Sequence, residues 1–359
     1  MERMTVSGRP PDRKSLIVEH LREEIVAGRL APGAQLPTRA EIEQRFGSGT
    51  GTVQRALDHL VRDGFVHSKG PKGTFVSSHP PHLTNFPLIF KEPFGEGGNK
   101  LRFSIALTNE AMKYERQGQI TLPRYYGVNG HTDSEDFGRL LRDVASQRVA
   151  GLIFMFPPRE LWGTPLLDQP GIPRLAVMET KIPGVPAIRL GSQGALQCRA
   201  LDYLASQGRQ RIAMIASPAF DPPEVFAAQV AQRGMTTRPH WLLRLGLDAP
   251  SAARECAGLL MDPGQSIRPD GLIVADDNMV EYATAGLVQA GARVPDDITV
   301  VAHCNFPWPT PSVLPVQRLG YDVRGVLETC FRIFNRQRRG EAVESMHTIA
   351  PVFEDELDN

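Results

Sequence analysis

The sequence predicts an α/β protein whose larger part is preceded by a small, mainly helical N-terminal part. Before residue 80, two amphipathic helical patterns are followed by a Gly-rich hairpin pattern. Beyond residue 100, short continuous apolar runs alternate with helical stretches, which is typical of parallel strands covered by helices on both faces. Because 359 residues exceed the size of one ordinary domain, we expect two or three structural units.

A short helix is expected to begin directly after Thr38. Thr38 stands three residues before Glu41, and this spacing permits a capping box in which each side chain bonds the backbone N–H of the other residue. The helix is expected to end near Arg45, because Gly47 and Gly49 supply the conformations that a sharp turn requires. A helix followed by so short a turn is typical of a helix-turn-helix unit.

A second helix is expected from about Gly51 to Asp63. Its apolar residues recur at helical spacing and form one stripe facing a core: Val53, Ala56, Leu57, Leu60 and Val61. The other face is left for a partner, and the N-terminal end of such a helix reaches base edges in the major groove of DNA. We therefore expect DNA contacts from Thr50, Gly51, Thr52, Gln54 and Arg55.

A basic hairpin is expected after this helix. Residues 65–68 and 74–76 alternate like two short strands, and Lys69, Gly70 and Lys72 lie at the tip between them. A basic tip of this kind suits a phosphate backbone. The alternative is an ordinary solvated face, but the agreement of helix pattern, turn and hairpin favours a winged helix-turn-helix that binds DNA.

The first 78 residues resemble the DNA-binding head of the GntR family of bacterial transcription regulators. The resemblance rests on a helix at residues 15–27, closed by Gly28, on the connector GRLAPGAQLP and on the helix-turn-helix with its hairpin. The family usually has an arginine where this chain has Ala40 and another where it has Thr50. The resemblance therefore implies DNA binding with an unusual operator sequence, in which Arg39 substitutes for the first missing arginine.

The distribution of charge along the chain indicates which kinds of partner the protein can bind. The chain carries 40 basic and 40 acidic residues, and a formal net charge of zero argues against a protein that coats nucleic acid or membranes without selectivity. Between Gln44 and His79, five Lys or Arg residues oppose two Asp residues. The basic excess thus lies on the predicted reading helix and hairpin.

The sequence gives no reason to expect a membrane span, a secretion signal, a disulfide framework or a metal site. No apolar stretch approaches the roughly 20 residues of a membrane span, and the first residues do not form a secretion signal. The four cysteines show neither a disulfide framework nor zinc-ligand spacing. His303 and Cys304 are neighbours, but adjacent side chains of a strand point to opposite faces, which argues against a metal pair. We expect a cytoplasmic protein without membrane partner, metal or cofactor.

The apolar runs of the larger part are expected to be strands of a doubly wound parallel sheet. They begin at residues 103, 124, 151, 174, 211, 271 and 298. Helical patterns lie between them, at 136–147, 195–208 and 279–292. In such sheets ligands bind in crevices outside the carboxyl ends of the strands.

The larger part resembles the effector-binding domain of the LacI family, a two-lobed fold similar to periplasmic sugar-binding proteins. The resemblance is carried by residues 191–218, 268–303 and 315–334. A GntR-type head on a LacI-type body is the arrangement of the arabinose repressor type. The resemblance implies a ligand-responsive transcription regulator, usually a repressor and a homodimer joined through the body, with operator DNA and a carbohydrate effector as partners.

The predicted organisation has three parts. A winged helix-turn-helix domain occupies residues 1–78, and a two-lobed effector-binding and dimerisation domain occupies residues 101–359. Residues 79–100 between them are rich in proline and glycine, which is typical of a linker. Within that linker, the apolar residues 88–90 are expected to form a short strand or to dock on the body.

The effector site departs from the family pattern. Pro222 stands where the family has an arginine, and the family's VVGFDD reads VVAHCN at residues 300–305. Asp276 is expected to line the site, whereas Asp277 is expected to be the N-cap of the following helix. Strand-end positions give the candidate ligand residues Asn109, Asn129, Arg159, Asp221, Asp276, His303 and Asn305. For each of them an ordinary structural role is an open alternative.

An enzymatic body is not expected. GntR-type heads are also fused to aminotransferase-like bodies that hold pyridoxal phosphate through a lysine, but this chain has no lysine after Lys181. It also lacks a Gly-rich phosphate loop, a G-x-S-x-G elbow and an H-E-x-x-H stretch. The alternative function is a carbohydrate-binding sensor whose degenerate head no longer binds DNA.

Overall fold

The computed structural model describes residues 12–95, 102–131, 134–177, 181–191, 194–218 and 220–357. It divides into two units. Unit 1 comprises Met1–Ile89, Tyr114–Ile153 and Glu160–Arg174, and unit 2 comprises Phe90–Lys113, Phe154–Arg159 and Leu175–Asn359. The predicted domain limits at 1–78, 79–100 and 101–359 stay a prediction.

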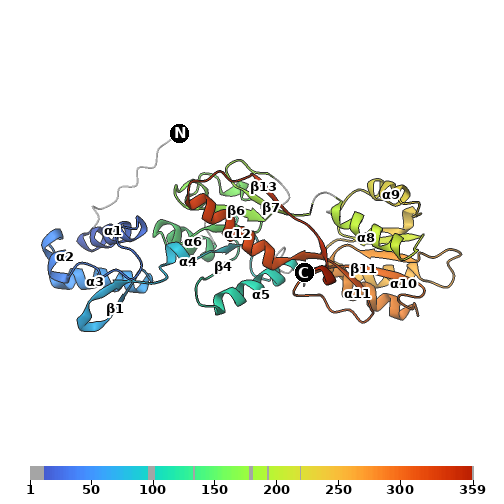
Figure 1. Cartoon of the computed structure of the whole chain (residues 1–359), viewed down its shortest axis with the longest axis horizontal. Coiled ribbons are helices and arrows are strands. Elements are labelled where there is room, and N and C mark those ends of the chain that lie inside the picture. The colour runs from blue at the N-terminus through green and yellow to red at the C-terminus, as the bar shows by residue number, and fades with distance from the viewer. Residues whose placement is uncertain are drawn as a thin grey trace. The chain divides into compact units, whose positions relative to one another are not determined.

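The N-terminal part of unit 1 is a three-helix head with a two-stranded wing (Figure 1). Its elements are α1 (Arg13–Val26), α2 (Arg39–Phe46), α3 (Thr50–Arg62), β1 (Val66–Ser68) and β2 (Thr74–Val76). The apolar stripe predicted for the second helix packs against α1, since Val53, Ala56 and Leu60 are fully buried with Ile17. Val61, also predicted for this stripe, is 42% exposed and is not part of it. The winged helix-turn-helix is therefore confirmed, and its reading helix begins one residue earlier than expected.

Local chemistry explains the turn between α2 and α3. Thr38 Oγ1 accepts a hydrogen bond from Glu41 N at 3.3 Å, and Thr38 N donates to Glu41 Oε2 at 2.6 Å, which completes the predicted capping box. At the other end of α2, Gly47 has φ +57°, a left-handed conformation that glycine adopts at low cost. The chain can therefore reverse within three residues and place α3 across the head.

The rest of unit 1 continues from the wing into short elements. They are α4 (Pro81–Thr84), β3 (Leu88–Ile89), β4 (Arg124–Tyr125), α6 (Glu135–Ala145) and α7 (Pro165–Asp168). β3 pairs in parallel with β4 through Leu88 and Arg124. The strand expected within the predicted linker is thus present as β3, and its two residues are fully buried.

Two six-stranded sheets form the body. The first has the strand order β13-β7-β6-β5-β3-β4, and the second has the order β14-β12-β11-β10-β8-β9. The strands not yet given are β5 (Leu152–Phe154), β6 (Arg174–Val177), β7 (Ala187–Leu190), β8 (Ile212–Ala216), β9 (Leu242–Arg244), β10 (Gly271–Val274), β11 (Thr299–Phe306), β12 (Gln317–Asp322), β13 (Met346–Ile349) and β14 (Val352–Phe353). The predicted α/β class with parallel sheets is confirmed.

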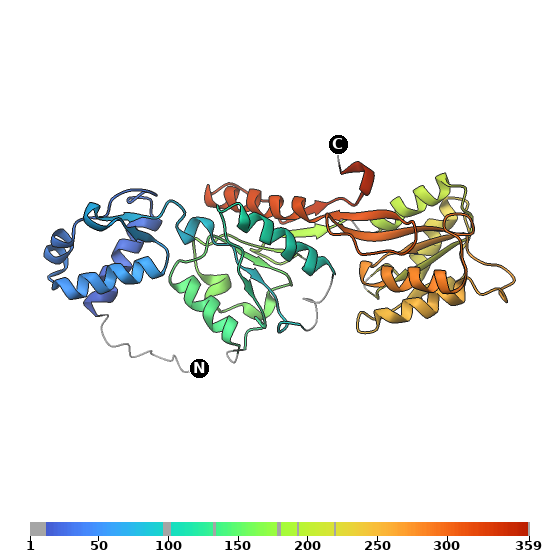
Figure 2. The ribbon, with the colours of Figure 1, turned by 90° about the horizontal axis from the view of Figure 1, so that it is seen from below.

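Helices cover both faces of the second sheet. α8 (Ala195–Ser206) and α9 (Pro223–Gln232) pack on one face, and α10 (Ala253–Leu260) and α11 (Asp277–Gln289) pack on the other (Figures 1 and 2). Every residue of β8 and β10 is buried, as expected for strands covered on both sides. The last long helix of the described chain is α12 (Val323–Arg338).

One predicted strand is wrong. The run that begins at Phe103 is part of a helix, α5 (Arg102–Arg116). Its buried residues include Ser104, Leu107 and Ala111, which recur at intervals of three and four and so follow a helical period. A run of five residues is too short to separate a strand from a buried helix segment, and only the longer window resolves the ambiguity. Among the described residues, no helix is long and apolar enough to cross a membrane.

Candidate functional site

The N-terminal end of α3 is open to a ligand. Gly49 caps the helix without a side-chain hydrogen bond, so the amide groups of the first turn and the positive end of the helix dipole face outward. Thr50, Gly51 and Arg55 are exposed there. This end of the helix therefore offers backbone donors and a cation to an anion such as a phosphate.

Two candidate reading side chains have partners within the helix. Gln54 Nε2 donates to Asp58 Oδ1 at 2.7 Å, and Arg55 Nε donates to the Gly51 carbonyl at 3.1 Å. Both bonds lie on one face of α3 and hold the side chains along the helix surface. Contact with a base edge therefore requires that these bonds be exchanged for bonds to DNA.

The wing presents two exposed lysines. Lys69 Nζ lies 4.7 Å from the centre of the Phe75 ring, and Lys72 lies in the short helical turn at the tip. Gln35 Nε2 donates to the Lys72 carbonyl at 3.1 Å, so the connector before α2 is hydrogen-bonded to the tip of the wing. Gly73 has φ +106°, and a Cβ there would lie 2.7 Å from Gln35 Nε2. Glycine at position 73 thus permits this close approach.

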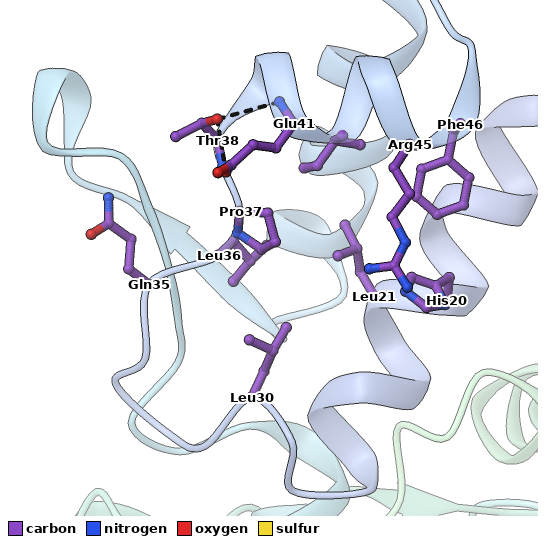
Figure 3. Close-up of a pocket in the computed structure, with 11 residues that line it drawn as sticks. His20, Leu21, Leu30, Gln35, Leu36, Pro37, Thr38, Glu41, Arg45 and Phe46 are labelled. Atoms are coloured by element: carbon purple, nitrogen blue, oxygen red, sulfur yellow. Dashed lines mark hydrogen bonds between the residues drawn. The ribbon is translucent and has the colours of Figure 1, made fainter.

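The head also has an open groove of about 630 Å³ beside α2. Figure 3 shows Arg45 and Phe46 of α2 approaching His20 of α1 on one side of it. The ring centres of His20 and Phe46 are 5.5 Å apart. None of the residues predicted to bind the effector lines this groove, so it is separate from the strand-end site described next.

Unit 2 holds a buried polar cluster at the carboxyl ends of two neighbouring strands. β10 and β11 pair in parallel with Val274 opposite Ala302, which brings the residues after β10 beside the end of β11. Asn305 Nδ2 donates to Asp277 Oδ2 at 2.5 Å, and His303 Nδ1 lies 3.7 Å from Asp277 Oδ1. Asp277 and Asn305 are both almost fully buried. A carboxylate, an amide and an imidazole therefore meet at the strand ends.

The expected N-cap of α11 at Asp277 is wrong by one residue. The N-cap of α11 is Asp276, whose Oδ1 accepts hydrogen bonds from Asn278 N at 3.0 Å and from Asn278 Nδ2 at 2.7 Å. Asp277 is the first helical residue and points into the strand-end cluster. The expectation failed because α11 begins one residue earlier than the sequence pattern indicated, and the capping position moved with it.

Two buried oxygens near the strand ends have no hydrogen-bond partner among the described residues. They are Oδ2 of Asp221, which follows β8, and Oδ1 of Asn305. Buried polar atoms are almost always paired, so each of these oxygens indicates a donor supplied by a water or a ligand. Burial raises the pKa of the neighbouring Cys304 thiol to about 12, which keeps it uncharged and apolar in this surrounding.

Comparison with known proteins assigns the head. The model of the bacterial regulatory proteins of the gntR family matches residues 14–76. An HTH-type transcriptional regulator of Mycobacterium tuberculosis, Rv1152, is 30% identical over 103 residues, which cover 27% of this chain and 81% of that protein. The chain belongs to the GntR family. It is accordingly a regulator of transcription with a DNA-binding head and not an enzyme.

The body of this GntR-family protein matches a second family model, that of the periplasmic binding protein-like domain, over residues 201–346. The arabinose metabolism transcriptional repressor of Halalkalibacterium halodurans is 20% identical over an alignment that covers 92% of each chain. A LacI family transcriptional regulator from Arthrobacter, solved in complex with lactose, has a TM-score of 0.56 at 17% identity and covers 75% of this chain and 97% of its own. The last likeness shows the fold of the body.

Of the remaining predicted ligand residues of this GntR-family chain, Asn129 and Arg159 follow strands, whereas Asn109 does not. Asn109 lies within α5 and not at a strand end, and Arg159 is exposed. Asn129 Oδ1 accepts a hydrogen bond from His131 N at 3.0 Å, which closes a local turn. The assignment of ligand and DNA contacts to individual residues stays a prediction.

A polar contact between Trp308, Glu110 and Lys113 in unit 2 was not predicted. Trp308 Nε1 donates to Glu110 Oε2 at 3.2 Å, and Lys113 Nζ lies 3.1 Å from the same oxygen. Lys113 also lies over the Trp308 ring, 4.8 Å from its centre. One face of the indole is therefore covered. The spacing of Glu110 and Lys113 is visible in the sequence, but nothing local indicates the tryptophan, which lies 198 residues away from Glu110.

Proposed function

We propose that the protein is a ligand-responsive transcriptional repressor that binds operator DNA through its winged head and a sugar or sugar derivative in its body. The observation that carries the proposal is the exposed, uncapped N-terminal end of α3 beside a wing with two exposed lysines. Phosphate contacts from the wing and helix dipole fix the register on DNA, and side chains of α3 read base edges.

The operator differs from those of typical relatives. Ala40 and Thr50 cannot donate the bidentate hydrogen bonds that arginine makes to guanine. Arg39, the first residue of α2, is exposed beside Ala40, and Gln54 and Arg55 are the remaining donors on α3. Gln54 pairs best with adenine, so we expect an operator with less guanine contact than the family usually makes.

The effector proposal rests on the strand-end cluster. Asn305 uses its amide nitrogen for Asp277, which leaves its unpaired Oδ1 as an acceptor. Asp221 Oδ2 is a second unpaired acceptor. Acceptors at strand ends suit ligand hydroxyl groups, and the likeness to an arabinose metabolism repressor over 92% of the chain supports a pentose or a related sugar.

Assembly and location follow from the same proposal. A repressor of this architecture binds a two-fold symmetric operator as a homodimer, because two heads then meet two half-sites. The proposed partner set is operator DNA, one small-molecule effector and a second copy of the chain. Its proposed location is the cytoplasm, where chromosomal DNA is accessible in bacteria.

The test of DNA binding uses the full-length chain and a labelled fragment from upstream of its own gene. We expect saturable binding that weakens steeply as salt rises and that exceeds binding to a shuffled fragment of equal length. Binding to both fragments with equal affinity at every salt concentration would support the alternative, a carbohydrate sensor with a degenerate head.

The test of effector binding is independent of DNA. A panel of pentoses, hexoses and sugar acids, with L-arabinose first, is added to the full-length chain, and the unfolding temperature is measured. A ligand of the folded state raises it in proportion to the logarithm of ligand concentration above Kd. A panel that leaves the unfolding temperature unchanged at millimolar sugar contradicts the carbohydrate assignment and leaves the DNA result standing.

A further inference from the structure

The reading helix α3 ends on a buried carboxylate. Asp63 is its C-cap, and the Asp63 side chain is 7% exposed. Its Oδ1 accepts a hydrogen bond from Arg148 Nη1 at 2.7 Å, and its Oδ2 lies 3.4 Å from both Arg22 Nη2 and His59 Nε2. A negative charge at this end of a helix opposes the helix dipole, so the position depends on the positive charges of Arg22 and Arg148.

Arg148 is not part of the head. It lies in the turn between α6 and β5, and all the residues of this contact belong to unit 1. The contact between Asp63 and Arg148 joins positions 85 residues apart. A second contact lies beside it, because Asn85 Nδ2 donates to the Arg148 carbonyl at 2.6 Å. The turn is therefore tied both to the reading helix and to the segment that follows the wing.

The other half of the Arg148 guanidinium faces away from the head. Its Nη2 donates to Asp143 Oδ1 of α6, and Asp143 Oδ2 accepts the hydrogen bond of the Tyr125 hydroxyl. Burial and the contact with Asp143 both raise the pKa of Tyr125, which keeps it a proton donor. Burial lowers the pKa of Arg148, but Asp143 and Asp63 outweigh it and raise that pKa. The arginine therefore stays charged between two carboxylates.

This chain of contacts leads to the strand-end loop of unit 1. Tyr125 is the last residue of β4, and the backbone N–H of Tyr126 donates to Asp136 Oδ2 of α6 at 2.8 Å. The loop that follows carries Asn129, one of the predicted effector residues. A shift of this loop can therefore be transmitted to Arg148 through the contacts of Tyr125 with Asp143 and of Asp143 with Arg148.

We propose that the Asp63–Arg148 ion pair is a regulatory joint that ties the reading helix to the α6–β5 turn and thereby sets the DNA affinity of the head. The inference rests on the proposed function and deepens it by naming the contact through which the body acts on the head. When the α6–β5 turn moves on effector binding, the pair opens and the head loses its fixed orientation.

The joint can open without leaving a charge unpaired. Asp63 keeps Arg22 and His59 within the head, and Arg148 keeps Asp143 within α6. Each partner thus has a second arrangement available, which a two-state element requires. A buried pair whose members had no other partner would instead act as a fixed link, because breaking it would strand a buried charge.

The test uses the full-length chain without ligand and compares Arg148→Met with Arg142→Met. Arg142 is exposed on α6, the helix directly before this turn, so the control removes the same charge from a neighbouring position. Hydrogen–deuterium exchange is followed at residues 63–65 and 77–85. We expect exchange there to become at least about tenfold faster in Arg148→Met and to stay unchanged in the control, with α1 amides equally protected in both. Arg148→Lys should give an intermediate rate, since one ammonium cannot bridge both carboxylates as a guanidinium does.

DNA affinity supplies the second readout. A head released from the joint must be ordered on binding, so Arg148→Met should bind the upstream fragment at least about threefold more weakly than Arg142→Met. Unchanged exchange at residues 63–65 and 77–85 overturns the joint. Faster exchange with unchanged DNA affinity leaves a structural contact and overturns its regulatory role. If the wild-type chain shows no preference for the upstream fragment, the proposed function fails, and the exchange result still decides the joint.

Discussion

Asp277 and Asn305 are joined by a hydrogen bond of 2.5 Å from Nδ2 of Asn305 to Oδ2 of Asp277, and neither residue is more than 3% exposed. The bond connects the first residue of α11 to β11, across the carboxyl ends of β10 and β11. It fixes the amide of Asn305 in one orientation and leaves its oxygen free for a donor. The geometry of the strand-end cluster depends on this pair.

Asp277→Leu is expected to lower the free energy of unfolding by about 1 to 3 kcal/mol, because it leaves the buried amide of Asn305 without a partner. Asn305→Leu should lower it by a similar amount, since the carboxylate then loses its donor. The double variant should lose at least about 1 kcal/mol less than the sum, because the two effects share one contact. Urea denaturation of the full-length chain measures all three, and strict additivity would contradict the pair.

Base reading should separate from phosphate contact in two variants of the head. Gln54→Ala is expected to relax base preference at one operator position by about 1 to 3 kcal/mol, whereas Lys72→Ala should weaken all sequences alike and lower the salt dependence by about one phosphate contact. Binding to a set of single-base operator variants at several salt concentrations measures both effects. Identical behaviour of the two variants would mean that α3 does not enter the groove as proposed.

Local sequence patterns predicted those parts of the fold that short-range chemistry determines. The capping box of Thr38 and Glu41, the turn at Gly47 and the apolar stripe of α3 all depend on neighbours within four residues. The strands β8, β10 and β11 were also predicted, because continuous apolar runs of this length indicate buried parallel strands. The helices, the turn and the wing of the head were therefore predictable from local patterns.

Contacts between distant segments were not predictable from one sequence. Asp277 meets Asn305 across 28 residues, and Asp63 meets Arg148 across 85. No periodic or compositional signal connects such pairs, and an aspartate at the end of a helix is more often a solvated residue. The wrong N-cap at Asp277 has a related origin, since a shift of one residue at a helix start changes which side chain caps the helix.

The capping box should make the head sensitive to acid. The hydrogen bonds from Thr38 hold the pKa of Glu41 below its ordinary value of 4.5. A carboxyl group whose pKa is lowered by folding contributes stability above the pKa of the unfolded chain, and this contribution is lost as pH falls through the lower folded value. In Thr38→Ala the pKa of Glu41 should rise toward 4.5, and the acid-dependent part of the stability should shrink. NMR titration of the Glu41 carboxyl carbon checks the shift, and an unchanged titration curve would contradict the capping role.

Asp221 offers a test in which stability and ligand binding should change in opposite directions. Its Oδ2 is buried without a partner among the described residues, and burying an unpaired carboxylate oxygen costs free energy. Asp221→Asn keeps the shape of the side chain and removes the charge, so the ligand-free chain should gain about 1 kcal/mol in free energy of unfolding. The same variant should lose most of the thermal shift produced by a sugar that stabilises the wild-type chain. Asn335→Ala serves as the control, because Asn335 is exposed on α12 and is not among the candidate ligand residues. A variant at position 221 that loses stability and keeps the full ligand-induced shift would show that the Asp221 carboxylate is a structural group and no part of the effector site.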